Sequence, residues 1–397
     1  MKPLSGIRLA DFTVHAAGPF CTHMLSQLGA ECIKVETAVR PDIFRKPHAV
    51  YGRLGPASFD QVASNKLSIR LNLKDSRGVL LAKRLVGVSD VAAESFRAGV
   101  MARLGLGYDD LRAVKRDIIM VSISSSGQSG PDSHFAGYAP LFGAWGGLGY
   151  LTGYEDGPPV EMRHVMDHSV GLNAALAVVA ALHLRRRSGQ GTHVDVAARE
   201  VASSLVGDAL MAAAAGVPQA RMGNHDHLRA PHGVFASAQP DRWISIAVGT
   251  DAEWKALAGA IGQPELSHDP RFATQAQRHA AREELDAAFG RWCAGQVAED
   301  AVAMLQTLGI PAHVSWNTLD VLQDPHLRHR GAIVEVAELD GGTRSAVGFP
   351  ARFSESENPA IERGTPRLGE HEGYVFGDLL GMREAEISAL VEDGVIY

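Results

Sequence analysis

The first 125 residues alternate short apolar runs with stretches of helical periodicity, and this alternation constrains the fold more than any other feature. The run at 7–12 leads into a helical stretch at 20–28, which Gly29 ends before a second run at 32–35. Because strands joined by such helices lie parallel, the pattern predicts an α/β domain on a parallel sheet. Further strands are predicted at 67–73, 90–96 and 118–123, with helices at 75–85, capped by Asp75, and at 104–114.

The pattern changes near residue 225, where strands and helices no longer alternate. The strand predicted at 243–248 is followed by a helix capped by Asp251, by helices at 282–293 and 298–308, and by a loop at 323–330. A strand at 333–337 and helices at 375–380 and 384–391 come last. We therefore expect a large α/β domain that begins with 1–200, a smaller α+β domain at 225–330, and a return of the chain to the large domain at 331–397.

The charge balance and the cysteines exclude several classes of protein. With 38 Lys and Arg against 45 Asp and Glu, the formal net charge is -7, so nothing in the composition favours binding to nucleic acid or to an anionic membrane. The 3 cysteines form no CxxC pair, which suits a reducing compartment. The apolar stretch at 170–184 is short for a membrane span and ends in Arg185–Arg187, so we expect a buried helix in a cytoplasmic protein.

Common cofactor and metal motifs are missing. The turn at 13–19 lacks the GxGxxG pattern of dinucleotide-binding folds, and the chain has no GxxxxGK[ST], HExxH or GxSxG. Among 17 histidines, His225 and His227 flank Asp226, but such a group is more often a polar loop than a metal site. We expect neither a metal nor a permanently bound cofactor.

Asp167 is the strongest candidate for chemistry, and two interpretations of it stay open on physical grounds alone. It precedes a long apolar helix at 173–184, where aspartate is a favoured N-cap. The same position suits catalysis, because a helix N-terminus favours the charged carboxylate and a carboxylate can act as a nucleophile in covalent catalysis.

Several segments, taken in order, resemble class III CoA-transferases of the CaiB/BaiF type, the family of formyl-CoA and carnitine CoA-transferases. They span almost the whole chain, and the ordered set is far more specific than any one of them. The segments are PLSGIRLADFT (3–13), LGAECIKVE (28–36), NKLSIRLNLK (65–74), RLGLGY (103–108), SGQGTHVDV (188–196) and GEH (369–371).

The resemblance implies a fold, an assembly and a reaction. The fold is a Rossmann-like large domain with a small domain, and two identical chains are threaded through each other as interlocked rings. The partners are an acyl-CoA donor and a carboxylic acid acceptor, and the nucleophile falls on Asp167. The implied intermediates are aspartyl anhydrides and an aspartyl-CoA thioester, with CoA acting as substrate.

The resemblance also implies CoA contacts at matching positions. Lys74 and Arg103 are the expected phosphate contacts, because a cation on a phosphate makes a charge-assisted bond. Formyl-CoA members have a glutamine in place of Ala16 and an arginine in place of Thr37, so formyl or oxalyl transfer is not expected, and Arg40 is a possible substitute. The full set is His15, Ala16, Ala17, Arg40, Leu71, Asn72, Leu73, Lys74, Ser95, Phe96, Arg97, Arg103, Gly137 and Tyr138.

Two other functions remain as alternatives. An α-methylacyl-CoA racemase shares the fold but needs a histidine where this chain has Tyr138, and a tyrosine hydroxyl titrating near ~10 is a poor second base. A non-catalytic acyl-CoA-binding subunit of a heteromeric transferase would have no chemical need for Asp167. The acyl group stays open, although an acid with a second carboxylate suits the residues Arg163, His164, His168 and His15.

Overall fold

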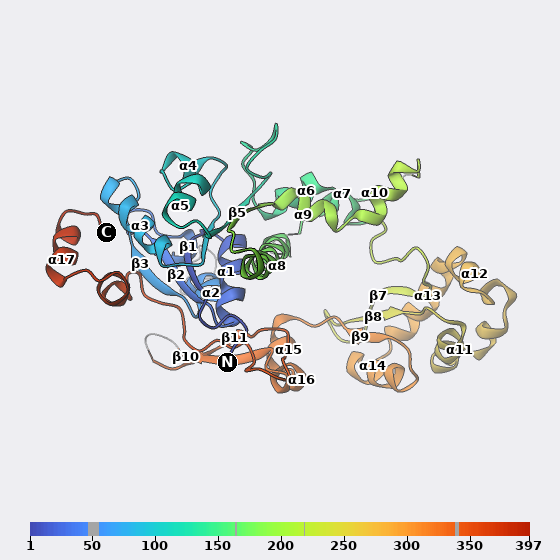
Figure 1. The fold of residues 1–397 in the computed structure, drawn as a ribbon. Helices are drawn as coiled ribbons and strands as arrows, with labels where there is room; N and C mark the ends of the chain where they lie inside the picture. Colours follow the sequence, from blue (N-terminus) through green and yellow to red (C-terminus); the bar gives the residue numbers. More distant parts are fainter. Residues whose placement is uncertain (47–54, 163–164, 218, 338–340) are drawn as a thin grey trace. The chain divides into compact units, whose positions relative to one another are not determined.

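The computed structural model describes residues 1–46, 55–162, 165–217, 219–337 and 341–397 (Figure 1). The chain forms two compact units. The larger unit comprises Met1–Gly149, Glu161–Val217 and Pro325–Tyr397, and the smaller unit comprises Tyr150–Val160 and Pro218–Asp324. Arg163 and His164 lie outside the described residues.

A six-stranded parallel sheet forms the centre of the larger unit and confirms the predicted α/β class. The strand order is β3-β2-β1-β4-β5-β6. The strands are β1 (Arg8–Phe12), β2 (Glu31–Glu36), β3 (Leu67–Arg70), β4 (Val91–Glu94), β5 (Ile119–Ser124) and β6 (Thr192–Ala197). The order reverses direction between β1 and β4, and ligands of open α/β sheets bind at such a switch point, outside the carboxyl ends of the strands.

Helices bury both faces of this sheet, as parallel sheets require. Successive residues of β1 point to opposite faces, so Leu9 packs in one core with α1 (Ala17–Gln27) and α8 (Val165–Ser188), whereas Ala10 packs in the other with α3 (Ser76–Gly87) and α5 (Tyr108–Val114). The second core also includes Val395 and Ile396 from the end of the chain.

Shorter elements complete the larger unit. They are η1 (Ile43–Arg45), α2 (Gly55–Ala63), α4 (Val100–Arg103), α6 (Ala139–Gly146), α7 (Leu148–Leu151), α9 (Ala198–Ser204), α10 (Gly207–Ala214), α16 (Pro325–His329), the hairpin of β10 (Ile333–Ala337) and β11 (Thr343–Val347), the π-helix η4 (Gly373–Leu379) and α17 (Glu384–Glu392). The α16 helix lies where the sequence predicts a loop.

The smaller unit packs helices on a three-stranded antiparallel sheet around Trp254, Phe272 and Phe289. Its strands are β7 (His232–Ala236), β8 (Trp243–Ala247) and β9 (Ala312–Val314), and its helices are α11 (Asp251–Ala260), η2 (Pro264–His268), η3 (Pro270–Phe272), α12 (Gln275–Ala280), α13 (Arg282–Cys293), α14 (Ala298–Thr307) and α15 (Thr318–Gln323). Thr250, not Asp251, caps α11, because the Thr250 side chain accepts a hydrogen bond from the Glu253 amide.

The α8 helix has the length and composition of a membrane span, but 39% of its most apolar window is buried in the larger unit. It contributes Met166, Val170 and Val178 to the core beside α1. Its other side leaves Leu172 and Leu176 exposed.

Candidate functional site

The predicted CoA contacts follow the carboxyl ends of the parallel strands. His15, Ala16 and Ala17 follow β1, while Ser95, Phe96 and Arg97 follow β4, on the two sides of the switch point. Arg40 follows β2, the segment 71–74 follows β3, and Gly137 and Tyr138 lie in the connection that follows β5. Arg103 ends α4, the short helix after the 95–97 segment. Parallel strands present their carboxyl ends at one edge, so the topology gathers these residues there.

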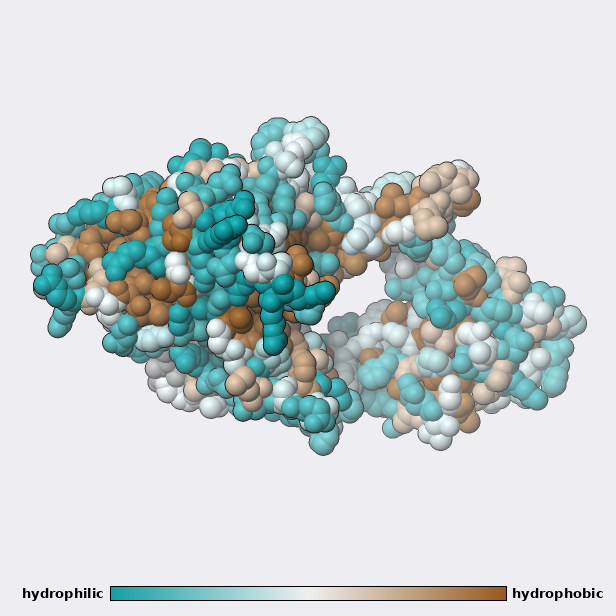
Figure 2. Space-filling model, viewed as in Figure 1, coloured by the Kyte–Doolittle hydropathy of each residue, from teal (hydrophilic) through white to brown (hydrophobic). Residues whose placement is uncertain are grey.

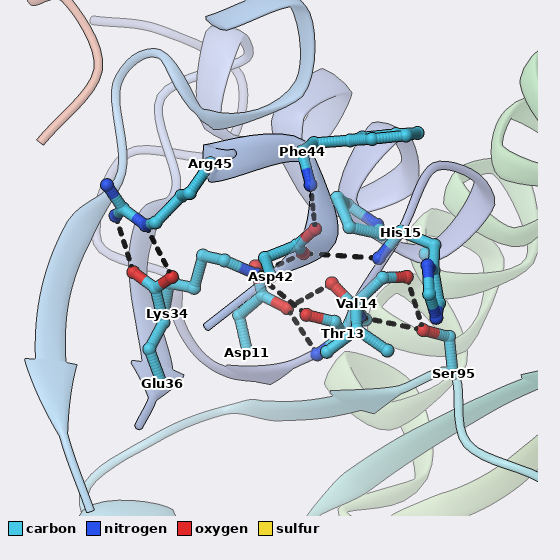
Figure 3. A network of polar contacts seen from close by, with 12 residues as sticks. Asp11, Thr13, Val14, His15, Lys34, Glu36, Asp42, Phe44, Arg45 and Ser95 are labelled. Atoms are coloured by element: carbon cyan, nitrogen blue, oxygen red, sulfur yellow. Dashed lines mark hydrogen bonds and ion pairs between the residues drawn. The ribbon is translucent and has the colours of Figure 1, made fainter. Parts of the chain in front are cut away.

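A single hydroxyl ties the β1 and β4 loops together at the switch point (Figure 3). Ser95 Oγ accepts a hydrogen bond from the Val14 amide at 2.9 Å and donates to the Val14 carbonyl at 3.0 Å. Gly18 permits this close approach, because a Cβ atom there would come within 2.8 Å of Ser95 Cβ. The two loops therefore hold a fixed spacing.

Two further side chains hold the same turn from β2 and from the segment that follows it. Lys34 Nζ donates to the Thr13 carbonyl at 2.7 Å, and Asp42 Oδ2 accepts from the His15 amide at 3.1 Å. Both side chains are almost fully buried, with 1% and 2% exposed. Side chains thus bind backbone groups of three consecutive residues, Thr13, Val14 and His15 (Figure 3).

His15 has a left-handed backbone, with φ of 66°, which is uncommon for a residue with a side chain. Its exposed ring meets the ring of Tyr138 edge-on, with centroids 6.1 Å apart. Close by in the chain, Phe20 of α1 contacts His168 of α8, with ring centroids 4.3 Å apart. The β1 turn, the start of α6 and the start of α8 thereby come together.

Asp167 lies in the first turn of α8, two residues inside the helix, and not at its cap. It is partly buried. Gly171, one turn later on the same helix face, packs against the Ala17 carbonyl and the Cys21 amide of α1. Asp167 therefore lies on the side of α8 that faces the beginning of α1, where the helix dipole of α8 still favours a negative charge.

A buried ion pair between Asp11 and Lys66 contacts the turn after β1. Asp11 Oδ2 accepts from Lys66 Nζ at 2.9 Å, and Asp11 Oδ1 accepts from the Thr13 amide at 2.9 Å. Lys66 also donates to the Pro19 carbonyl at 3.0 Å. Burial raises the pKa of Asp11, but Lys66 and Lys34 outweigh this effect and lower it to about 2. The carboxylate is therefore charged at any physiological pH.

Glu94, the last residue of β4, orients the loop that carries the predicted contacts 95–97. Its carboxylate accepts from the Phe96 amide at 2.8 Å. Burial raises the pKa of Glu94 to about 7, against the hydrogen bonds from Ser122 and Phe96 and with a further contribution from Asp195. This carboxyl group thus changes charge near neutral pH.

The cations among the predicted CoA contacts, which include the expected phosphate contacts Lys74 and Arg103, are exposed at this edge. Arg40, Lys74, Arg97 and Arg103 are all exposed, and none forms an ion pair with a carboxylate of the described residues. Unpaired cations of this kind suit a polyanionic ligand.

Sequence reasoning missed Lys34 and Asp42, which hold the turn after β1, and Glu94, which orients the loop after β4. A signal exists for two of them, because a charged residue within a strand buried on both faces needs a partner. In the smaller unit, Asp226 accepts from the amides of Leu228 and Arg229, as a polar loop residue does. Over the described residues, no group of three or more His, Cys, Asp and Glu side chains is placed to hold a metal ion.

Comparisons with known proteins agree in the family they indicate. Residues 4–372 match the model of CoA-transferase family III. A succinyl-CoA–D-citramalate CoA-transferase of Chloroflexus aurantiacus is 34% identical over 100% of this chain and 98% of that protein. A succinyl-CoA:glutarate CoA-transferase of Mus musculus is 33% identical over 100% of this chain and 91% of that protein. The crystal structure of a CaiB/BaiF family protein from Brucella suis superposes with a TM-score of 0.85 at 29% identity, covering 95% of this chain and 99% of that one.

Proposed function

Because the chain belongs to CoA-transferase family III and is a CoA-transferase, we propose that it moves CoA from an acyl-CoA to a carboxylic acid through covalent intermediates on Asp167. The observation that carries the proposal is the place of Asp167 in the first turn of α8, on the side that packs against the start of α1. The exposed cations Lys74 and Arg103 at the same sheet edge suit the phosphates of CoA.

The first half of the reaction loads CoA onto the enzyme. The Asp167 carboxylate attacks the thioester carbonyl of the donor, CoA leaves as thiolate, and a mixed anhydride forms. The thiolate then attacks the aspartyl carbonyl of that anhydride. The donor acid leaves as a carboxylate, and Asp167 carries CoA as a thioester.

The second half reverses these steps with a new acid. The acceptor carboxylate attacks the aspartyl thioester, which releases the thiolate and forms a second anhydride. The thiolate attacks the acceptor's carbonyl, so the new acyl-CoA leaves and Asp167 is again a carboxylate. Each step exchanges one nucleophile for another at an acyl carbon, and backbone amides at helix starts can stabilise the oxyanions.

We propose a dicarboxylic acyl group as the donor, with succinyl-CoA as the first to test. Two relatives carry succinyl-CoA in their names, with the dicarboxylic acids citramalate and glutarate as the other substrates. His15 and His168, which lie near the starts of α1 and α8, offer polar contacts to a second carboxylate. A panel of CoA donors and acids, assayed for exchange, tests this choice.

We further propose that the enzyme is a cytoplasmic homodimer of interlocked chains. The α10 helix supports an interface with a second chain, because none of its residues is buried although it exposes Leu210 at 55% and Met211 at 76%. Figure 2 shows apolar surface over this helix. Exposed apolar surface of this kind marks a protein interface, and closed symmetric dimers are the commonest assembly.

The decisive test of the mechanism is Asp167→Ala, assayed for transfer, dimer formation and CoA binding. We expect loss of transfer with a folded dimer that still binds CoA. Asp300→Ala is the matched control, because Asp300 is an exposed aspartate in the first turn of α14. In the wild-type enzyme, hydroxylamine added with acyl-CoA should convert Asp167 to a hydroxamate, detected by peptide mass. Full activity of Asp167→Ala would refute the mechanism.

The racemase alternative has its own test. Wild-type enzyme is incubated with a 2-methylacyl-CoA in deuterated water, and exchange of the α-proton is followed by mass. We expect no exchange above that of Asp167→Ala, since Tyr138 stands where a second base is needed. Robust exchange would favour acid/base chemistry over transfer.

A further inference from the structure

We propose that Asp42 and Lys34 are positioning residues for CoA: they hold the turn after β1, and through it His15, in the shape that receives the ligand. The inference rests on the proposed function, which counts His15 among the CoA contacts. Neither residue reaches the ligand in this view, since both are buried and both bind the backbone of the turn.

The two oxygens of Asp42 have separate tasks. Oδ2 accepts from the His15 amide at 3.1 Å and lies 3.7 Å from Lys34 Nζ, while Oδ1 accepts from the Phe44 amide at 3.0 Å. Two amide donors and one ammonium group therefore converge on this carboxylate. A carboxylate accepts hydrogen bonds through both oxygens and therefore matches these donors. An asparagine of the same shape does not, because its NH2 group is a donor.

Lys34 provides the charge that lets the carboxylate be buried. Its ammonium group donates to the Thr13 carbonyl, two residues before His15. Burial lowers the pKa of Lys34, but Asp11, Glu36 and Asp42 outweigh this effect and raise it above the ordinary value. The nearby Arg45 guanidinium has the opposite, smaller effect and lowers the pKa of Lys34. The ammonium group thus stays charged, and Lys34 and Asp42 together hold both ends of the segment 13–15.

Asp42 is itself held from the sheet. Its side chain caps η1, whose last residue, Arg45, binds both carboxylate oxygens of Glu36 at 2.7 and 2.6 Å. The Arg45 guanidinium also lies over the Phe59 ring at 4.0 Å. A continuous series of contacts therefore runs from the end of β2 through η1 to the His15 amide (Figure 3).

The geometry indicates positioning because the restrained residue is strained and exposed. His15 has φ of 66° and an exposed ring, so neither backbone preference nor packing in a core fixes its direction. Strained backbone persists only where the surroundings determine it, and it gathers at ligand sites. Asp42 supplies that restraint through the His15 amide itself.

The chain offers a matched control at the opposite edge of the sheet. Asp90 precedes β4 at its amino end, accepts from the Arg8 amide at 2.9 Å and binds Arg185 at 2.8 Å. Asp90 and Asp42 therefore share one chemistry, a carboxylate between a backbone amide and a cation. Only Asp42 faces the carboxyl ends of the strands, where the ligand is expected.

The experiment compares Asp42→Asn with Asp90→Asn by calorimetric titration with free CoA and by steady-state kinetics. In Asp42→Asn, the new side-chain NH2 group would face the backbone amide of His15 or of Phe44, so one hydrogen bond to a charged acceptor is lost. We therefore expect CoA to bind about tenfold more weakly, which is the scale of one such bond. KM for the acyl-CoA should rise by a similar factor, with KM for the acceptor acid unchanged. Hydrogen exchange at 13–16 should speed up in Asp42→Asn alone.

A purely structural role gives a different result. In that case Asp42→Asn and Asp90→Asn would lower the melting temperature alike and bind CoA as the wild type does, which overturns the inference. If Asp42→Asn does not fold, Asp42→Glu keeps the charge beside Lys34 but moves the carboxylate oxygens away from the His15 amide, and unchanged CoA binding there would also overturn the inference. Binding of CoA does not need Asp167, so activity retained in Asp167→Ala would refute the mechanism and leave this result standing.

Discussion

Gly171 of α8 lies so close to Ala17 of α1 that a methyl group on Gly171 would come within 2.7 Å of the Ala17 carbonyl oxygen. It would also lie 2.9 Å from the Phe20 ring. This contact brings the two helices together one turn after Asp167. The distance between the proposed nucleophile and the turn that carries His15 thus depends on the absence of a side chain at one position.

Gly171→Ala should therefore lower activity through helix displacement. Overpacking of this kind destabilises a protein by about 1–3 kcal/mol, and we expect kcat to fall because Asp167 moves with α8. Gly259→Ala is the control, since Gly259 lies within α11 with no atom within 4 Å of an added Cβ, and alanine there should stabilise the helix by about 0.5–1 kcal/mol. Melting temperature and kcat are measured for both. Unchanged kcat in Gly171→Ala would contradict the role given to this contact.

Lys66→Met should destabilise the enzyme strongly. Asp11 and Lys66 are both fully buried, and removal of one partner of a buried pair leaves an uncompensated charge, at about 3–5 kcal/mol. We expect the double variant Asp11→Asn with Lys66→Met to regain part of this loss. Urea unfolding of the two single variants and the double variant measures the coupling. Additive effects would show that the pair contributes no interaction of its own.

The strands and most helices of the larger unit follow from sequence pattern, because each depends on periodicity within one segment. Asp75 caps α3 as predicted, with its side chain accepting from the Arg77 amide. The predicted CoA contacts reach one edge because parallel strands end there. One strand, β6, is missing from the predicted strands, although His193 and Asp195 alternate with Val194 and Val196 as in a strand with one exposed face.

The contacts that shape the site do not follow from sequence. Lys34, Asp42 and Ser95 bind backbone groups of residues up to 81 positions away, and no local pattern encodes such distances. The beginning of α8 is also hard to place, because His168 and Ser169 interrupt its apolar periodicity. A charged residue in a buried strand is the one available signal, and it shows that a partner exists without naming it.

The stability of the enzyme should fall between pH 5 and pH 8 in part because of Glu94. Burial raises its pKa to about 7, whereas an unfolded glutamate titrates at about 4.3. Between these values the folded state holds a proton that the unfolded state has lost, so stability decreases as pH rises, by on the order of 2–3 kcal/mol in total.

Glu94→Gln tests this dependence by removing the charge. We expect its melting temperature to exceed that of the wild type at pH 8 and the difference to shrink at pH 5. Glu355→Gln, at an exposed position, should change the melting temperature equally at both pH values. A difference for Glu94→Gln that does not vary with pH would contradict the buried protonated state.

Lys74 should bind the 3′-phosphate of CoA. Thioesters of dephospho-CoA lack that phosphate, so they distinguish this contact from a general effect of removing a positive charge. Lys74 is exposed, and its amide donates to Asn72 Oδ1 at 3.1 Å, which fixes the backbone from which the ammonium group extends. For Lys74→Ala we expect KM for the acyl-CoA to rise about threefold to tenfold with kcat unchanged, because an exposed charge-assisted bond is modest. With the dephospho-thioester, KM should be the same for wild type and Lys74→Ala. Lys255→Ala, an exposed lysine of α11, controls for net charge. Equal increases of KM with both thioesters would place the Lys74 contact elsewhere on the ligand.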